Sequence, residues 1–174
     1  PEGVNLFESA VINEYLDELH PPRLFPADPL SRAQDRMWRD FVATLYGPVY
    51  SYYSAKSAEN AARHQSGMNG TLARLDLELA EKDKSTSAGP YFHGQRFSIV
   101  DVVGAPLLMR LTWAEQLAPN VSPLNGFPHL QAWRDELMAR PSVQKSVLPE
   151  IFEIFMASIR KGGSWLVESE RLTA

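Results

Sequence analysis

The fold is decided by residues 94–117, which read GQRFSIVDVVGAPLLMRLTWAEQL. The β-branched residues in this stretch could be mistaken for a strand, but the apolar pattern continues well beyond strand length. Ser98 precedes Asp101 by three residues, which resembles a helix capping box with Asp in place of Glu or Gln. Phe97 and Val102 occupy the two positions of a hydrophobic staple. These features predict a helix after Ser98 that is apolar nearly all round and forms the buried centre of a helical domain.

Helical periodicity continues on both sides of this stretch. Apolar residues at spacings of three and four predict further helices over residues 9–19, 29–45, 71–82, 128–139 and 149–161. Asp28 and Pro29 suit an N-cap and a first helical position. The pair Gly47-Pro48 is expected to break or kink a helix. Residues 4–7 alternate weakly and permit one short strand, so the prediction is an all-α domain with at most one strand.

Composition limits what kind of protein this is. The chain has 174 residues, 44% hydrophobic and 22% charged, with a net charge of −4, which fits one domain or one domain plus a fragment of another. The basic residues are scattered among a larger number of acidic ones, so no nucleic-acid partner is expected. No apolar run is long enough to predict a membrane span. The absence of cysteine excludes disulfides and a cysteine nucleophile from these residues, and no signal peptide is visible, so we expect a cytoplasmic location.

The pair Glu8-Ser9 stands where an extended segment gives way to a helix. The N–H groups of a first helical turn are unpaired and the helix dipole is positive there, so a carboxylate can bind, with the serine hydroxyl as a further donor. The alternative is that Ser9 merely caps its own helix, which is the commoner use of serine at such a position.

Aromatic residues form a second candidate feature. Tyr46 and Tyr50 share a helix face if the helix survives Gly47-Pro48, and they could line an apolar pocket. Packing or a dimer surface is the alternative. Ser98 and Asp101 are interpreted as a structural cap, because no histidine near them in sequence completes a catalytic set. The four histidines follow no metal-binding spacing, so no metal site is expected.

Four segments, in order along the chain, resemble the glutathione S-transferase family. They are residues 6–18 (LFESAVINEYLDE), 24–29 (LFPADP) with Arg32-Ala33-Gln34, 94–102 (GQRFSIVDV), and 127–133 (FPHLQAW) with 140–143 (RPSV). The resemblance covers residues 6 to about 147 and is nearest to bacterial or omega-like members. It implies an all-α C-terminal helical bundle preceded by the last strand and helix of a thioredoxin-like domain.

The resemblance also implies an activity and a site. In the family a Glu-Ser pair binds the γ-glutamyl end of glutathione, which makes Glu8 and Ser9 the expected glutathione-binding residues and favours binding over capping. By position, Tyr46, Tyr50 and Trp113 would line the pocket for a small hydrophobic electrophile, with Trp165 as a lid. Glutathione would be a cosubstrate, no metal would be needed, and a homodimer is expected.

The resemblance divides the chain into three parts. Residues 1–20 would be the end of the thioredoxin-like glutathione-binding domain, residues 21–29 a linker, and residues 30–174 the helical C-terminal domain. The family's thiol-activating Tyr, Ser or Cys lies near the start of the thioredoxin-like domain, so we expect no catalytic residue within this chain and no activity from it alone. Two alternatives stay open: a non-catalytic transferase-like interaction module, and a helical bundle unrelated to transferases.

Overall fold

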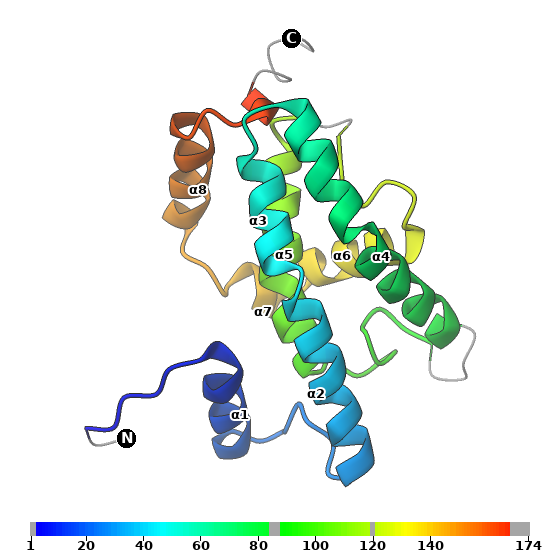
Figure 1. Cartoon of the computed structure of the whole chain (residues 1–174). Helices are drawn as coiled ribbons and strands as arrows, with labels where there is room; N and C mark the ends of the chain where they lie inside the picture. Colours follow the sequence, from blue (N-terminus) through cyan, green and yellow to red (C-terminus); the bar gives the residue numbers. More distant parts are fainter. Residues whose placement is uncertain (1–2, 84–87, 119–120, 168–174) are drawn as a thin grey trace.

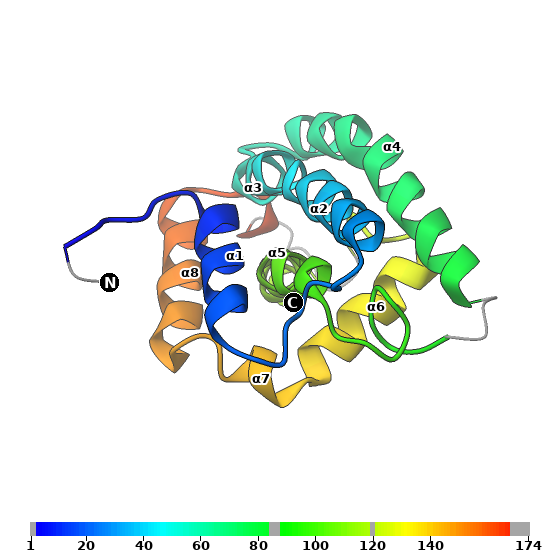
Figure 2. The ribbon, with the colours of Figure 1, turned by 90° about the horizontal axis from the view of Figure 1, so that it is seen from below.

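One apolar helix, α5 (Ile99–Glu115), runs through the middle of the molecule. The computed structural model describes residues 3–83, 88–118 and 121–167. Figure 2 looks along α5 and shows the other helices arranged around it. The buried residues of α5 include Ile99, Val100, Leu108 and Met109, which lie on different sides of the helix. The prediction of a central buried helix in an all-α bundle is therefore confirmed.

The start of α5 is held by the carboxylate of Asp101, which has no exposed surface. Oδ2 accepts hydrogen bonds from the Ser98 backbone N–H and the Ser98 hydroxyl, each at 2.8 Å. Oδ1 accepts hydrogen bonds from the Phe92 N–H and the Trp133 indole N–H, each also at 2.8 Å. Both contacts of a capping box are present. Asp101 therefore joins the first turn of α5 to the preceding loop and to helix α6.

Helix α6 (Pro128–Ala139) lies close against α5 at Gly104. A β-carbon added to Gly104 would approach the ring of Trp133 to 2.4 Å, so a larger residue would push the two helices apart. After α6 the chain forms α7 (Pro141–Gln144) and α8 (Pro149–Lys161). The bounds of α6 and α8 agree with the prediction, whereas the single turn of α7 is too short to show a periodic pattern.

Helices α2 (Pro29–Ala43) and α3 (Tyr46–Ser54) begin the bundle, and α2 packs on α5. The carboxylate of Asp28 accepts a hydrogen bond from the Ser31 N–H at 2.8 Å and caps α2, with Pro29 in the first turn. The helix breaks after residue 43 rather than at Gly47-Pro48. Pro48 lies in the first turn of α3, where a backbone N–H has no intrahelical partner, so the proline costs that helix no hydrogen bond.

Helix α4 (Ala58–Asp83) is much longer than the predicted 71–82. Its first half contains Gly67 and Gly70 among polar residues, which weakens the apolar periodicity on which the prediction rested. Two apolar side chains there are nevertheless buried, Ala61 and Met68 each being 1% exposed. Packing against α3 therefore decides the length of α4, and local sequence does not.

Helix α1 (Ser9–Leu19) stands apart from the bundle at the N-terminal side, as Figure 1 shows. Residues 4–8 form no strand, because a strand requires a neighbouring strand and the described residues contain only two isolated bridges, both within residues 91–96. The buried Asp17 fastens α1 to the linker by accepting hydrogen bonds from the N–H groups of Leu24 and Phe25, at 2.5 and 3.3 Å. Within the described residues, no helix is long and apolar enough to cross a membrane.

Candidate functional site

Helix α1 begins without a side-chain cap. Glu8 is the N-cap residue, its side chain makes no capping hydrogen bond, and Ser9 follows as the first helical residue. Ser9 therefore does not cap its own helix, which was the simpler interpretation of this serine. The side chains of Glu8 and Ser9 are both exposed. The first N–H groups of α1, which have no partner within the helix, are thus available to a ligand together with the Ser9 hydroxyl.

The backbone of Glu8 is strained. Its φ of 68° and ψ of 112° place it in a region that favours glycine. Holding another residue there costs about 1–3 kcal/mol, and such residues cluster at ligand sites. Because the positive end of the α1 dipole lies at the same point, the start of α1 is suited to a carboxylate.

Ser9 and Tyr46 line one pocket. The pocket has a volume of about 510 Å³ and lies where α1 faces α2, α3 and the first half of α5. Its wall is made of Ser9, Ala10, Asn13, Arg39, Asp40, Ala43, Tyr46, Val102, Val103 and Pro106. The structure thus places the uncapped start of α1 next to a mostly apolar wall, an arrangement that suits a ligand with one acidic and one apolar part.

The Tyr46 hydroxyl is already engaged. It donates a hydrogen bond to the Val103 carbonyl oxygen at 2.8 Å, which fixes the ring across the groove between α3 and α5. Burial raises the pKa of Tyr46, while the positive charge of Arg110 acts in the opposite direction. Tyr46 is therefore neutral at physiological pH, and its fixed ring forms part of the pocket wall.

A cluster of charges holds α1 beside this pocket. The Glu14 carboxylate receives hydrogen bonds from Arg36 at 3.2 and 2.6 Å and from Arg39 at 2.6 Å, so one side chain of α1 joins two positions of α2. The hydrogen bonds from Arg36 lower the pKa of Glu14, against the effect of burial. Arg39 is 7% exposed and also bonds Asp40 at 2.8 Å. These bonds set the position of the Ser9 end of α1 relative to α2.

Tyr50 and Trp113 belong to an adjoining run of aromatic rings. Ring centroids are 5.4 Å apart from Tyr50 to Tyr53, 5.2 Å from Tyr53 to Phe155, and 5.5 Å from Phe155 to Trp113. Tyr50 lines a second pocket of about 150 Å³ between α3 and α8, together with Tyr53 and Phe155. The structure connects Tyr50 and Trp113 through these rings, but neither lines the pocket of Ser9 and Tyr46.

Trp165 lies elsewhere. It is 8% exposed, its indole N–H donates to the Tyr52 carbonyl oxygen at 3.2 Å, and its backbone N–H donates to the Ala55 carbonyl oxygen at 2.9 Å. It lines neither of the two pockets described above. The structure places Trp165 as an anchor of residues 164–167 on α3, and the expected position as a lid over the pocket is not observed.

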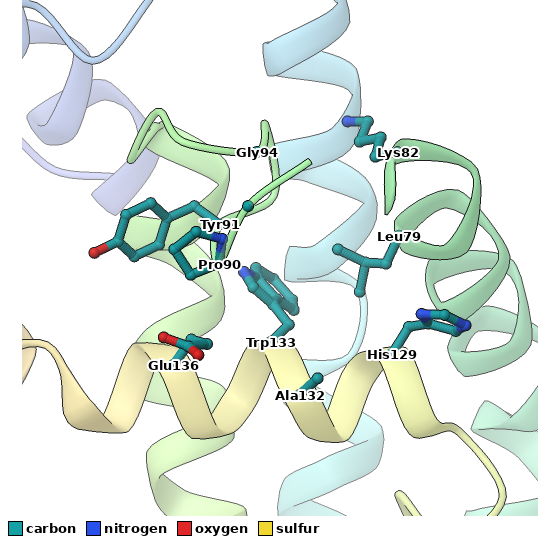
Figure 3. A pocket seen from close by; sticks show the side chains of 10 residues that line it. Leu79, Lys82, Pro90, Tyr91, Gly94, His129, Ala132, Trp133 and Glu136 are labelled. Carbon is teal, nitrogen blue, oxygen red and sulfur yellow. The ribbon is translucent and has the colours of Figure 1, made fainter. Parts of the chain in front are cut away.

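Another pocket, of about 360 Å³, opens between α4, residues 89–94 and α6. Figure 3 shows Glu136, Trp133 and His129 reaching into it from α6, with Leu79 opposite them on α4. None of the site residues predicted from sequence lines this pocket. Among residues 3–83, 88–118 and 121–167, no group of three or more metal-ligating side chains could hold an ion.

Sequence reasoning missed several residues of the site. Arg39 and Phe155 carry no motif, and their roles depend on which helices face each other. Arg110 had a signal: it is the charged residue that ends the apolar pattern of α5. A charge at such a point needs a partner or a function, because burying it unpaired is unfavourable.

Comparison with known proteins agrees with this architecture. The family model described as glutathione S-transferase, C-terminal domain, matches residues 39–141, which is more than half of the chain. The chain belongs to the glutathione S-transferase family. Glutathione S-transferase U19 of Arabidopsis thaliana is 33% identical over 165 residues, which cover 91% of this chain and 70% of that protein.

Two further relatives bear on function. The crystal structure of a rice glutathione S-transferase in complex with glutathione superimposes with a TM-score of 0.68 at 25% identity, over 90% of this chain and 71% of that one. A stringent starvation protein A homolog of Coxiella burnetii is 37% identical over 107 residues, 61% of this chain and 48% of that protein. The family and its fold are thus established, and one protein similar to this chain is not named as a transferase.

Proposed function

We propose that this protein is a glutathione S-transferase that joins the thiolate of glutathione to small hydrophobic electrophiles. The observation that carries the proposal is the uncapped, strained start of α1, where Glu8 and Ser9 lie, beside a pocket whose far wall is Tyr46 and α5. The first N–H groups of α1 and the Ser9 hydroxyl would hold the γ-glutamyl carboxylate of glutathione. The electrophile would lie toward Tyr46 and the aromatic rings beyond it.

The proposed reaction divides its requirements between two regions. The thiolate sulfur attacks an electrophilic centre, a new bond to sulfur forms, and the leaving group departs with its electron pair. The residues described here bind and orient the two reactants, which raises their effective concentration. A separate donor has to lower the pKa of the glutathione thiol, and we expect that group near the start of the thioredoxin-like domain, outside residues 1–174.

Exposed apolar side chains support the proposed domain division at residues 20 and 30. Phe7 is 79% exposed, Val4 is 65% exposed and Leu19 is 53% exposed. Apolar side chains gathered on one short segment usually contact another surface. We propose that residues 1–20 complete a thioredoxin-like glutathione-binding domain that covers them, with residues 21–29 as linker and 30–174 as the helical domain. Residues 1–174 alone should then conjugate no glutathione.

Retention on immobilised glutathione tests the proposal, with the full-length protein that includes the complete thioredoxin-like domain. We expect retention, and we expect Ser9→Ala to weaken glutathione binding about 10-fold in a calorimetric titration, because one hydrogen bond to a charged group is lost. Ser66→Ala removes an exposed hydroxyl in the middle of α4 and should change nothing. Equal affinity of the Ser9→Ala and Ser66→Ala proteins would reject the site at α1.

A second candidate function is a non-catalytic interaction module with a transferase fold. The similarity to a stringent starvation protein A homolog favours it. This module would keep the bundle but would not turn over a chlorinated aromatic electrophile with glutathione. An assay of conjugation by the full-length protein separates the two candidates, because only a transferase gives a rate above the uncatalysed reaction.

A homodimer is part of the proposal. An apolar groove of about 370 Å³ lies between α2 and α4 and is lined by Met37, Trp38, Asp40, Phe41, Thr44 and Arg74. Met37 in the groove is 56% exposed, and Leu77 on α4 is 52% exposed. The acidic Asp40 on one side of the groove and the basic Arg74 on the other suit a twofold contact in which each meets its opposite on a second copy. We expect the dimer to be cytoplasmic.

A further inference from the structure

Arg110 occupies the α5 surface between the two pockets of the candidate site. It follows Pro106, which lines the pocket of Ser9 and Tyr46, by one helical turn and so lies on the same face of α5. Its guanidinium carbon lies 4.3 Å from the centre of the Trp113 ring and 5.6 Å from that of Phe155. Phe155 in turn lines the pocket that contains Tyr50. The cation thus stands beside the aromatic part of the groove.

The guanidinium of Arg110 has an unsatisfied nitrogen. Nη1 is buried and has no hydrogen-bond partner among the described residues, and no carboxylate in that part of the chain forms an ion pair with Arg110. Other arginines that are at least partly buried do have such partners: Arg39 bonds Glu14 at 2.6 Å, and Arg134 bonds Glu115 at 3.0 Å. An unpaired, partly desolvated cation is costly, and an anion that approaches it removes part of that cost.

The positive charge of Arg110 acts on a tyrosine in each of the two pockets. It opposes the effect of burial on the pKa of Tyr46, which lines the first pocket, and on the pKa of Tyr53, which lines the second. The same positive potential acts on any group that enters the groove between α3 and α5. It favours a negative group and disfavours a positive one.

We propose that Arg110 makes this groove select aromatic electrophiles that carry a carboxylate or sulfonate. The inference rests on the proposed function and names its substrate class. The rings of Trp113, Phe155 and Tyr53 would contact the aromatic part of the substrate, while the guanidinium pairs with its anionic group. With a chlorinated aromatic acid, the glutathione thiolate forms the carbon–sulfur bond and chloride leaves with the electron pair. Arg110 is a positioning residue in this reaction and touches no reacting atom.

A matched pair of fluorescent probes tests the charge preference without glutathione. The probe 8-anilinonaphthalene-1-sulfonate differs from N-phenyl-1-naphthylamine only by its sulfonate. In titrations of the full-length protein, Arg110→Gln should weaken the affinity for the sulfonate probe about 10-fold. The affinity for the neutral probe should change by less than about 2-fold. Arg110→Lys should keep most of the preference. The control Arg63→Gln removes an exposed cation of α4 and should change neither affinity.

Arg110→Met is the control for a change of fold, because the methionine side chain can still pack on Trp113. If the Gln and Met variants lose the same amount of affinity for both probes, or lose affinity for neither, the proposal is overturned and Arg110 is a packing residue. If glutathione fails to bind while the probe preference holds, the proposed function fails and the anion selectivity stands. For conjugation, the ratio of kcat/KM for 4-chloro-3-nitrobenzoate over 4-chloro-3-nitrobenzamide should fall about 10-fold in Arg110→Gln.

Discussion

Asp101 is a buried charge that the fold depends on. Its carboxylate accepts hydrogen bonds from Ser98, Phe92 and Trp133, all of them donors that are themselves buried. Asp101→Asn replaces one acceptor oxygen by a donor, so two donors lose their partner. We expect a loss of about 3 kcal/mol or more in the free energy of unfolding, measured by urea denaturation. Asp135→Asn, at a side chain 67% exposed, should cost less than about 0.5 kcal/mol. Equal stability of the two variants would contradict this role of the charge.

Single residues were predictable from sequence where local geometry decides them. The Ser98–Asp101 spacing predicted a cap because both residues lie within one helical turn. The bonds from Phe92 and Trp133 to the same carboxylate could not be predicted, because they depend on how α6 meets α5. Trp165 shows the same limit: its aromatic character was visible, but its burial against Tyr52 depends on the path of the chain after α8.

At the level of elements, α1 is held to the bundle by charge. The lowered pKa of Glu14 means that its carboxylate stabilises the folded state above the ordinary carboxyl pKa, near 4.5, and that this contribution is lost as pH falls through the lowered value. Glu14→Gln should cost about 1–2 kcal/mol at pH 7. The cost should shrink as the pH falls below the ordinary carboxyl pKa toward the lowered pKa of Glu14, because the wild-type carboxylate becomes protonated over that range.

Urea unfolding of both proteins between pH 3 and pH 7 measures this difference. The matched control is Glu59→Gln, which removes a carboxylate paired with Arg63 on the exposed side of α4, the Glu59 side chain being 86% exposed. That pair is surrounded by water and should contribute at most a few tenths of a kcal/mol at any pH. A Glu14→Gln effect that is the same at pH 3 and pH 7 would show that the charge of Glu14 does not hold α1.

Helix bounds were predictable where proline or glycine borders the apolar periodicity, as for α1, α6 and α8. They were not predictable where packing overrides propensity, as in the first half of α4 with its glycines.

At the scale of the whole molecule, even less of the structure can be predicted from sequence. Ser9 and Tyr46 each carried a sequence signal, but their common pocket arises only because Glu14 and Asp17 turn α1 toward α2 and the linker. Contacts between distant segments have no local pattern that could reveal them.

The whole molecule also has to bury the groove between α2 and α4 if it is to form a dimer. Met37→Glu places a charge on this apolar groove, and burying an unpaired carboxylate against a second copy would be unfavourable. We expect the full-length wild type to elute as a dimer in size-exclusion chromatography with light scattering, and Met37→Glu to raise its dissociation constant at least 100-fold. Ile154→Glu, on the 62% exposed Ile154 of α8, is the control and should leave the dimer intact, because α8 lies on the other side of α5 from α4. A Met37→Glu protein that remains dimeric would move the contact away from α2 and α4, and the aromatic groove beside α8 would then be the next surface to mutate.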